Sequence, residues 1–343
     1  MKPHDLFNDE RWTAILRMFP QDLEESARAC EAITRVRNIP SAGNLLRMVL
    51  AYAVSDLSLK DTAAWAKADG VANLTSQALH YRLMRSGEWL ESLLGQLLFQ
   101  GPRENRFGLP LRVVDGTVIT GPGSHGTDWV LHIVLDPMSG RFVSFDVTDA
   151  HGAESFCRHT FHPGEIVLGD RMYATARGIE SVVSHGAYPL VRVNLRTIKI
   201  CAPDRQRYHL ASLEPMVREK GPISLDILIP VPPDMQGRKS KNWDIKHASS
   251  WIPARIVGGP TKKGVVWVIT TLTRAQMSDQ AVLELYRLRW QVELLFKRLK
   301  SLLHLDDLPK SDGPISKPWI LGRLLAAAIA QNLVCPTGLF PPG

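Results

Sequence analysis

The sequence has few cysteines and no apolar run long enough to cross a membrane. Its four cysteines are scattered along the chain: Cys30, Cys157, Cys201 and Cys335. They lack the CxxC spacing of zinc sites, so they predict reduced thiols. The longest apolar stretch, 319–334, contains Arg323 and is shorter than the roughly 20 residues of a membrane-spanning helix. The first residues, MKPHDLFNDERW, show no apolar core of an export signal, and we expect a cytoplasmic protein.

The sequence also lacks internal repeats and low-complexity tracts, and its composition of 45% hydrophobic and 22% charged residues is that of a globular protein. Its net charge of +7 is unevenly distributed. Residues 196–263 contain 13 Lys and Arg against 6 Asp and Glu, which leaves the rest of the chain neutral. A basic segment on a neutral body indicates a polyanionic partner such as nucleic acid. A solvated basic loop region remains the alternative.

Residues 1–105 are predicted to form a helical domain. Residues 42–54 are apolar with helical spacing, and two further helical segments follow on either side of Gly70. Ser58 and Thr75 are suitable N-caps for these two segments. This arrangement predicts a helix-turn-helix that binds DNA, with a packed helical hairpin as the alternative. The residues expected to face a DNA groove are Gln77, His80, Tyr81, Arg82 and Arg85.

Residues 106–335 are predicted to form a mixed α/β domain whose elements follow the order β-β-β-α-β-α-β. The expected elements are strands at 111–120, 129–135 and 141–147, a helix at 154–161, a strand at 165–170, a helix at 175–184 and a strand at 188–193. Residues 194–263 are Pro- and Lys/Arg-rich and predict a β-rich insertion. A strand at 265–271, a long helix at 278–303, a final helix and a short tail at 336–343 complete the chain.

The long helix carries the most informative pattern. Beside its buried apolar stripe lies a second stripe formed by Tyr286, Arg289, Glu293 and Lys300, which share an arc of about 60° on an ideal helix. A carboxylate flanked by cations beside a buried face is partly shielded from solvent. An intrahelical ion pair between Arg289 and Glu293 is the simpler interpretation.

Two aspartates extend this pattern. Asp115 and Asp170 each lie at the end of an apolar β segment, where strand ends open onto a crevice. Together with Glu293 they offer three hard oxygen donors, which suit Mg²⁺ or Mn²⁺ better than structural zinc. Two such ions about 4 Å apart stabilise the attacking and the leaving oxygen of a phosphoryl displacement.

The residues then show a specific resemblance. The run Tyr286-x2-Arg289-x3-Glu293-x6-Lys300 resembles the Y-(2)-R-(3)-E-(6)-K signature of the IS4 family of bacterial DDE transposases. Asp115 in VVDGT and Asp170 in LGDRMY resemble the two aspartates of that family. The resemblance covers roughly residues 105–335. It implies an RNase H-like fold with a β-rich insertion between the second aspartate and the glutamate.

The resemblance also implies a function. Similar enzymes bind the terminal inverted repeats of their element, nick the DNA to free a 3′-OH and join that hydroxyl to target DNA. By this resemblance Asp115, Asp170 and Glu293 are the catalytic residues and hold two Mg²⁺ or Mn²⁺ ions. A homodimer in a synaptic complex with DNA is the expected assembly. The residues expected to contact DNA from the long helix are Tyr286, Arg289, Lys297 and Lys300.

Several aromatic, histidine and acidic residues lie outside this signature. In similar enzymes a flipped base stacks on a Trp that precedes the glutamate helix; Trp267 matches it by position, with a core role as the alternative. Trp243 and Trp251 are weaker candidates. The sequence leaves open whether Glu154 assists the site. The histidines before Asp170 lack the spacing of a helical zinc motif and predict no metal site: His151, His159 and His162.

Three other functions remain as alternatives. An RNase H-like nuclease would use the same residues but hydrolyse DNA without strand transfer. A DNA-binding regulator would use the N-terminal helices alone, with a catalytically silent second domain. A two-carboxylate glycosidase is the most distant alternative, because it leaves the cations of the long helix unexplained.

Overall fold

The computed structural model describes most of the chain. The described ranges are 9–19, 21–34, 39–55, 57–98, 108–121, 123–124, 126–138, 141–233, 243–262, 264–302, 304–305, 308 and 313–334, with backbone only at 98, 141–142, 290–300, 302, 331 and 333–334. The predicted tail at 336–343 lies outside these ranges. None of the helices within them is long and apolar enough to cross a membrane.

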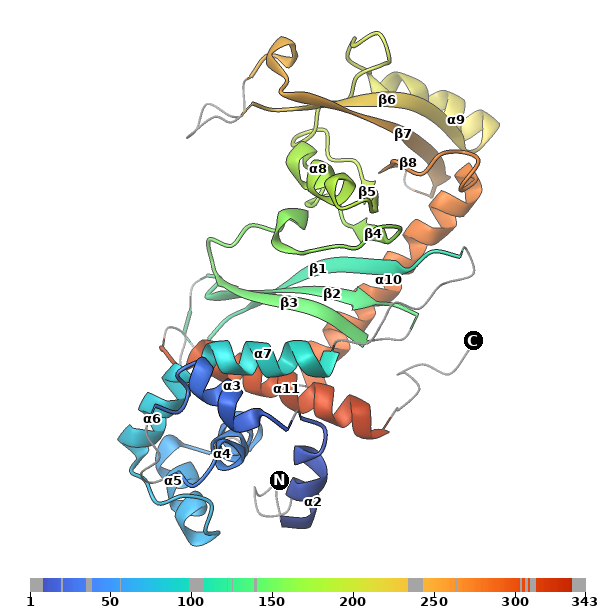
Figure 1. Cartoon of the computed structure of the whole chain (residues 1–343). Coiled ribbons are helices and arrows are strands. Elements are labelled where there is room, and N and C mark those ends of the chain that lie inside the picture. The colour runs from blue at the N-terminus through green and yellow to red at the C-terminus, as the bar shows by residue number, and fades with distance from the viewer. Residues whose placement is uncertain are drawn as a thin grey trace.

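The N-terminal part of the structure is helical, as predicted (Figure 1). Its helices are α2 (Asp9–Leu16), α3 (Leu23–Ala29), α4 (Ala42–Val54), α5 (Leu59–Ala68), α6 (Ser76–Arg85) and α7 (Gly87–Leu98). Helix α4 has the predicted bounds, and nearly all of its residues are buried. Ser58 and Thr75 cap α5 and α6 as predicted, because their hydroxyls accept hydrogen bonds from the backbone N–H groups of Asp61 and Ala78.

Helices α5 and α6 are joined by a tight turn. Gly70 adopts a φ of +66°, a left-handed conformation that glycine tolerates best and that commonly ends a helix. The N–H groups of Val71 and Ala72 then donate to the carbonyl oxygen of Ala66 and close the end of α5. This geometry is compatible with both the helix-turn-helix and the helical hairpin.

The rest of the chain builds one mixed sheet of eight strands in the order β3-β2-β1-β4-β5-β8-β7-β6. The strands are β1 (Leu111–Ile119), β2 (Trp129–Asp136), β3 (Arg141–Asp149), β4 (Ile166–Gly169), β5 (Tyr188–Arg192), β6 (Ile223–Val231), β7 (Ser250–Thr261) and β8 (Gly264–Thr270). Strands β1, β4 and β5 are parallel neighbours, and the other pairs are antiparallel.

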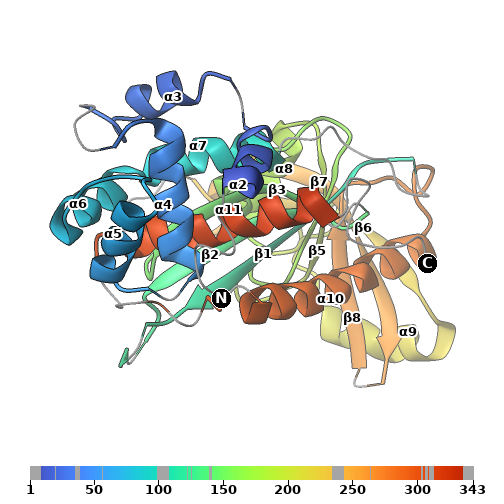
Figure 2. The same ribbon diagram turned by 90° about the horizontal axis from the view of Figure 1, so that it is seen from below.

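Helices cover both faces of this sheet. Helix α10 (Asp279–Leu302) runs along one face beside β1, β4, β5, β7 and β8, and α11 (Ser316–Val334) follows it (Figures 1 and 2). Helices α8 (Ala176–Ser184) and α9 (Glu214–Lys220) contribute to a second core on the other face. Alternate strand residues belong to different cores: Val113 packs with the α10 side and Val114 with the α8 side.

Two features differ from the sequence-based expectations. The helix predicted at 154–161 is wrong, because only a short 3₁₀ turn forms at Phe156–Arg158. The segment 194–263 is β-rich, but β6 and β7 extend the main sheet through the pairing of β7 with β8. The strand β7 and the helix α9 were missed, because prolines and charges obscure their apolar pattern.

The last helix returns to the N-terminal helices. Helix α11 packs on α4 and α7, although its place in the sequence assigns it to the second domain (Figure 1). Gly322 permits this close approach, because a Cβ there would lie 2.8 Å from the Cβ of Ala53. The helical part and the sheet are therefore joined through a shared core on the α10 side.

Candidate active site

The pairing of β1 with β4 brings the two predicted aspartates together. In this parallel pair Leu111 lies opposite Ile166 and Val113 opposite Leu168. Continuing that register by two residues places Asp115 level with Asp170, just after β4 ends. Asp115 is thus inside the longer strand β1 rather than at its end, but it lies beyond the end of its shorter neighbour.

Backbone groups and close packing orient both carboxylates. The N–H of Gly116 donates to Oδ1 of Asp115 at 3.0 Å, and the N–H of Met172 donates to Oδ1 of Asp170 at 2.6 Å. Gly169 lets the backbone before Asp170 pack tightly, because a Cβ there would lie 2.6 Å from the ring of Phe156. The chain around both aspartates is therefore held in place on each side.

Helix α10 passes the same strands. It contacts β1 and β4, and by strand alternation Asp115 lies on the α10 face, together with Val113. The expected third carboxylate, Glu293, lies on α10, as do Lys297 and Lys300. The side chains of these three residues lie outside the described part of the structure. The backbone thus carries the three predicted catalytic residues on elements that contact one another.

A further carboxylate, that of Glu154, approaches the two aspartates from the face of the sheet opposite α10. A Cβ built on Gly116 would lie 2.7 Å from Oε1 of Glu154, so the glutamate covers the bare backbone beside Asp115. Burial, then repulsion from Asp170 and Asp115, raises the pKa of Glu154 to about 7. The sequence offered Glu154 only as an undecided residue, because nothing in it shows that Gly116 makes room for the glutamate.

A buried phenol lies beside these carboxylates. Tyr173 is fully buried, and its hydroxyl has no hydrogen-bond partner among the described residues. Burial, followed by repulsion from Glu154, Asp115 and Asp170, raises the pKa of Tyr173 well above its usual value. The phenol therefore stays protonated and offers an O–H donor to a neighbouring anion.

The donor chemistry of this site fits a divalent cation. Among the residues with described side chains, no group of three or more His, Cys, Asp or Glu is placed to hold a metal ion by itself. The two aspartates and Glu154 nevertheless repel one another, and a cation bound by Asp115, Asp170 and Glu293 would offset that repulsion. Carboxylate oxygens are the ligands that Mg²⁺ and Mn²⁺ prefer.

Comparison with known proteins identifies the family. Residues 106–329 match the family model of the transposase DDE domain. The chain belongs to this family of DDE transposases. It is 33% identical to the transposase of insertion sequence element IS421 of Escherichia coli, with 98% of this chain and 97% of that protein covered. Its identity to InsL of Escherichia coli K12, which is assigned as the transposase of insertion sequence element IS186A, is also 33%, with the same shares of the two chains covered.

These relatives confirm the IS4-type DDE transposase expected from the sequence and its function as an insertion-sequence transposase. They favour it over the nuclease, the silent regulator and the glycosidase. Among solved structures, a piggyBac transposase synaptic complex with hairpin DNA has a TM-score of 0.40 and 9% identity, covering 98% of this chain and 82% of that one. Membership of the DDE transposase family implies dependence on a divalent metal and action on DNA.

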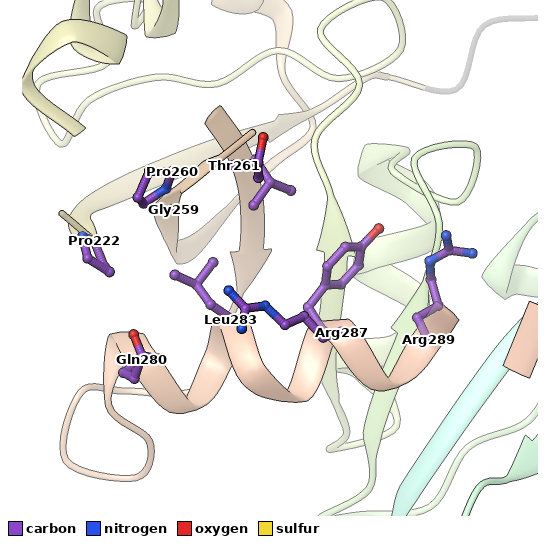
Figure 3. A pocket seen from close by; sticks show the side chains of 10 residues that line it. Pro222, Gly259, Pro260, Thr261, Gln280, Leu283, Arg287 and Arg289 are labelled. Atoms are coloured by element: carbon purple, nitrogen blue, oxygen red, sulfur yellow. The ribbon is translucent and has the colours of Figure 1, made fainter. Parts of the chain in front are cut away.

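The first turns of α10 in this transposase carry cationic and aromatic groups. The guanidinium carbon of Arg289 lies 5.9 Å from the ring centroid of Tyr286. Burial raises the pKa of Tyr286, whereas Arg289 and then Arg192 act in the opposite direction. Both residues line a cavity of about 610 Å³. Figure 3 shows Leu283, Arg287 and Arg289 along α10, with Pro260 of β7 opposite them.

The tryptophans differ in their exposure to a DNA ligand. Trp267 is 7% exposed and belongs to the core on the α8 side, where its indole covers Gly258 at distances that leave no room for a Cβ. This burial favours the core role over the base-stacking role. Trp243 and Trp251 instead carry the cations Lys199 and Arg205 over their rings, at 4.3 and 5.0 Å.

Among the described residues, the histidines before Asp170 belong to no group of three or more His, Cys, Asp or Glu that could hold a metal ion. His159 is buried, and its Nδ1 lies 3.4 Å from the hydroxyl of Ser144. Burial, then the charge of neighbouring His132, lowers the pKa of His159 to about 4. His151 and His162 are exposed. These residues have structural or surface positions.

The candidate DNA-reading helix α6 presents part of the predicted set to solvent. Tyr81 is 47% exposed, and the guanidinium of Arg85 lies over its ring at 5.1 Å. Gln77 and His80 line a second cavity, of about 640 Å³, between α5, α6 and the start of α11. Arg82 donates to the carbonyl oxygen of Ala32 and so ties α6 to the segment that follows α3.

Proposed function

We propose that this transposase cleaves the ends of its insertion sequence and joins the freed 3′-OH to target DNA, with Asp115, Asp170 and Glu293 as its catalytic residues. The observation that carries this assignment is the β1–β4 register, which places Asp115 level with Asp170 beside the helix of Glu293. We further propose that the divalent metal is Mg²⁺ or Mn²⁺ and that two ions bind.

The three carboxylates would hold the ions at the edge where β4 ends. Bound there, the ions would supply activation of the attacking oxygen and stabilisation of the leaving oxygen. The chain's own part is positioning: the N–H groups of Gly116 and Met172 each donate to the Oδ1 atom of one aspartate and so orient its carboxylate. Tyr173 and Phe156 keep the α8 side of the site dry.

The cationic face of α10 would hold the DNA backbone next to these carboxylates. Arg289 and Tyr286 line the cavity beside the site, and we assign phosphate contacts to both. Lys297 and Lys300 follow on the same helix and are proposed to continue the contact. Trp267 would stack on a flipped base only if β8 left the core.

The N-terminal helices are proposed to bind the terminal inverted repeats. The exposed ring of Tyr81, with Arg85 over it on α6, and the residues lining the second cavity support a DNA-facing surface. We propose that two copies of the chain pair the two element ends in a synaptic complex. The packing of α11 on α4 links this region to the catalytic sheet.

Substitution of the three carboxylates tests the catalytic assignment. Asp115→Asn, Asp170→Asn and Glu293→Gln should each abolish nicking and joining of labelled element ends in Mg²⁺, while binding of those ends persists in a gel-shift assay. Glu219→Gln, an exposed change on α9, is the matched control. Retained cleavage by the Glu293→Gln protein would overturn the assignment of that residue. Nicks without joined products would favour the nuclease alternative.

A further inference from the structure

The loop that carries Glu154 is built to hold that residue in one place. Ser155 caps the following turn by accepting a hydrogen bond from the N–H of Cys157 at 3.2 Å. Arg158 donates to the carbonyl oxygen of Ala153 at 2.6 Å and pairs with Asp146 of β3 at 3.1 Å. The residues on both sides of Glu154 are thereby tied to the sheet.

Neighbouring aromatic rings fix the same loop from within. Phe156 is fully buried, with its ring centroid 5.0 Å from that of Tyr173. This anchor lies two residues from Glu154 and directs the glutamate towards Gly116. A half-buried glutamate with such a fixed backbone has lost much of the freedom it would need to avoid the aspartates.

The position of Glu154 depends on a glycine in β1. Gly116 follows Asp115, and its absent side chain would point to the face opposite Asp115. Oε1 of Glu154 occupies that space, 2.7 Å from where a Cβ would lie. A residue with any side chain at 116 would push the glutamate away from the site. Gly116 therefore admits a carboxylate that the three-residue signature does not include.

We propose that Glu154 is a fourth acidic residue of the catalytic centre, which strengthens binding of the divalent cation by adding negative charge next to Asp115 and Asp170. This inference rests on the proposed function. Glu154 acts as a positioning residue that works through the two aspartates from the α8 side. The fully buried phenol of Tyr173 has no hydrogen-bond partner among the described residues, and the charges of all three carboxylates, together with its burial, raise its pKa.

Metal binding without DNA tests the proposal directly. Mn²⁺ titration of the full chain, followed by electron paramagnetic resonance of the free ion, measures affinity independently of activity. Glu154→Gln should weaken Mn²⁺ binding by about 10- to 100-fold, the usual effect of removing a group that supports metal ligands. Glu219→Gln removes one exposed charge on α9, which packs on β7 and β8, and should leave the affinity unchanged.

A second set of variants tests the role of Gly116. Gly116→Ala should weaken Mn²⁺ binding, because its methyl group displaces Glu154. Combining Gly116→Ala with Glu154→Asp shortens the displaced side chain and should restore part of the affinity. A purely structural role for Glu154 predicts instead that Glu154→Gln lowers the melting temperature in EDTA and leaves Mn²⁺ affinity intact. That result would overturn the proposal.

Asp115→Asn separates failure of this inference from failure of the proposed function. If Asp115→Asn abolishes Mn²⁺ binding and Glu154→Gln changes it by less than about twofold, only the role of Glu154 is refuted. If neither variant changes Mn²⁺ affinity, the metal site itself is misassigned. Weaker binding in both variants, with normal folding in EDTA, supports both assignments.

Discussion

Replacement of Arg255 by methionine should destabilise the protein strongly, because this buried arginine anchors the start of α10. Arg255 extends from β7 and is 3% exposed. Its guanidinium donates to the carbonyl oxygens of Leu272 and Met277, which precede α10, and to Asp279, the first residue of the helix. One side chain therefore closes the connection between the sheet and the helix that carries Glu293.

The size of the destabilisation follows from the polar groups that lose their hydrogen-bond donor when Arg255 is replaced. Methionine would leave two buried carbonyl oxygens without a donor, at about 1–3 kcal/mol each. Asp279 is 29% exposed on its side chain and would recover part of its hydration. The sum agrees with the roughly 3–5 kcal/mol that breaking a buried ion pair costs. At about 2 °C per kcal/mol for a chain larger than 150 residues, the melting temperature should fall by about 6–10 °C.

Arg274 provides the matched control. It pairs with Asp226 at 2.6 Å, but the two side chains are 49% and 67% exposed. An exposed pair contributes about 0–1 kcal/mol, so Arg274→Met should shift the melting temperature by no more than about 2 °C. Thermal unfolding in EDTA, with urea titration as a second measure, compares the two variants. Equal losses in both, or a loss below about 1 kcal/mol for Arg255→Met, would refute the reasoning.

Three further predictions concern packing and pH. Gly322→Val should destabilise the protein and loosen the packing of α11, because even a Cβ at 322 would lie 2.8 Å from the Cβ of Ala53. Gly95→Ala on the open face of α7 should instead stabilise the protein by about 0.5–1 kcal/mol, because nothing lies near that position and alanine favours the helix. Urea titration measures the unfolding free energy of both variants. The pKa of His159 near 4 lies below its unfolded value of 6.5, so the unfolded state binds more protons between these values. Stability should therefore be complete above about pH 6.5 and decline by about 3 kcal/mol as the pH falls to about 4. His159→Gln should flatten that part of the profile, and an unchanged slope would contradict the assignment.

The sequence predicts best those features that depend on neighbouring residues. The bounds of α4 follow from a continuous apolar pattern, and the caps at Ser58 and Thr75 follow from hydroxyls placed before helical segments. The stripe of residues along α10 is likewise a local property, because the spacing of residues on a helix determines which face each side chain occupies. These features need no knowledge of the tertiary structure.

Features that depend on pairing between distant segments were missed or left open. Glu154 reaches the site only because Gly116, on another strand, has no side chain. The sequence left both a base-stacking role and a core role open for Trp267, because its burial depends on β7 lying beside β8. The helix α11 leaves the sheet for α4 because Gly322 fits against it. In each case the partner is set by the fold rather than by sequence spacing.

A buried ion pair lies at the start of the pairing between β1 and β4, whose register places the two aspartates level with each other. Arg112 of β1 pairs with Glu165, directly before β4, at 2.8 Å, and all its atoms are nearly inaccessible. Buried pairs seldom add much net stability, because desolvation offsets their attraction. A shift of one residue between β1 and β4, however, would separate this pair, invert every side chain of the shifted strand and move Asp115 away from Asp170. The cost of leaving Arg112 unpaired thus disfavours the registers in which the two aspartates no longer face the same helix.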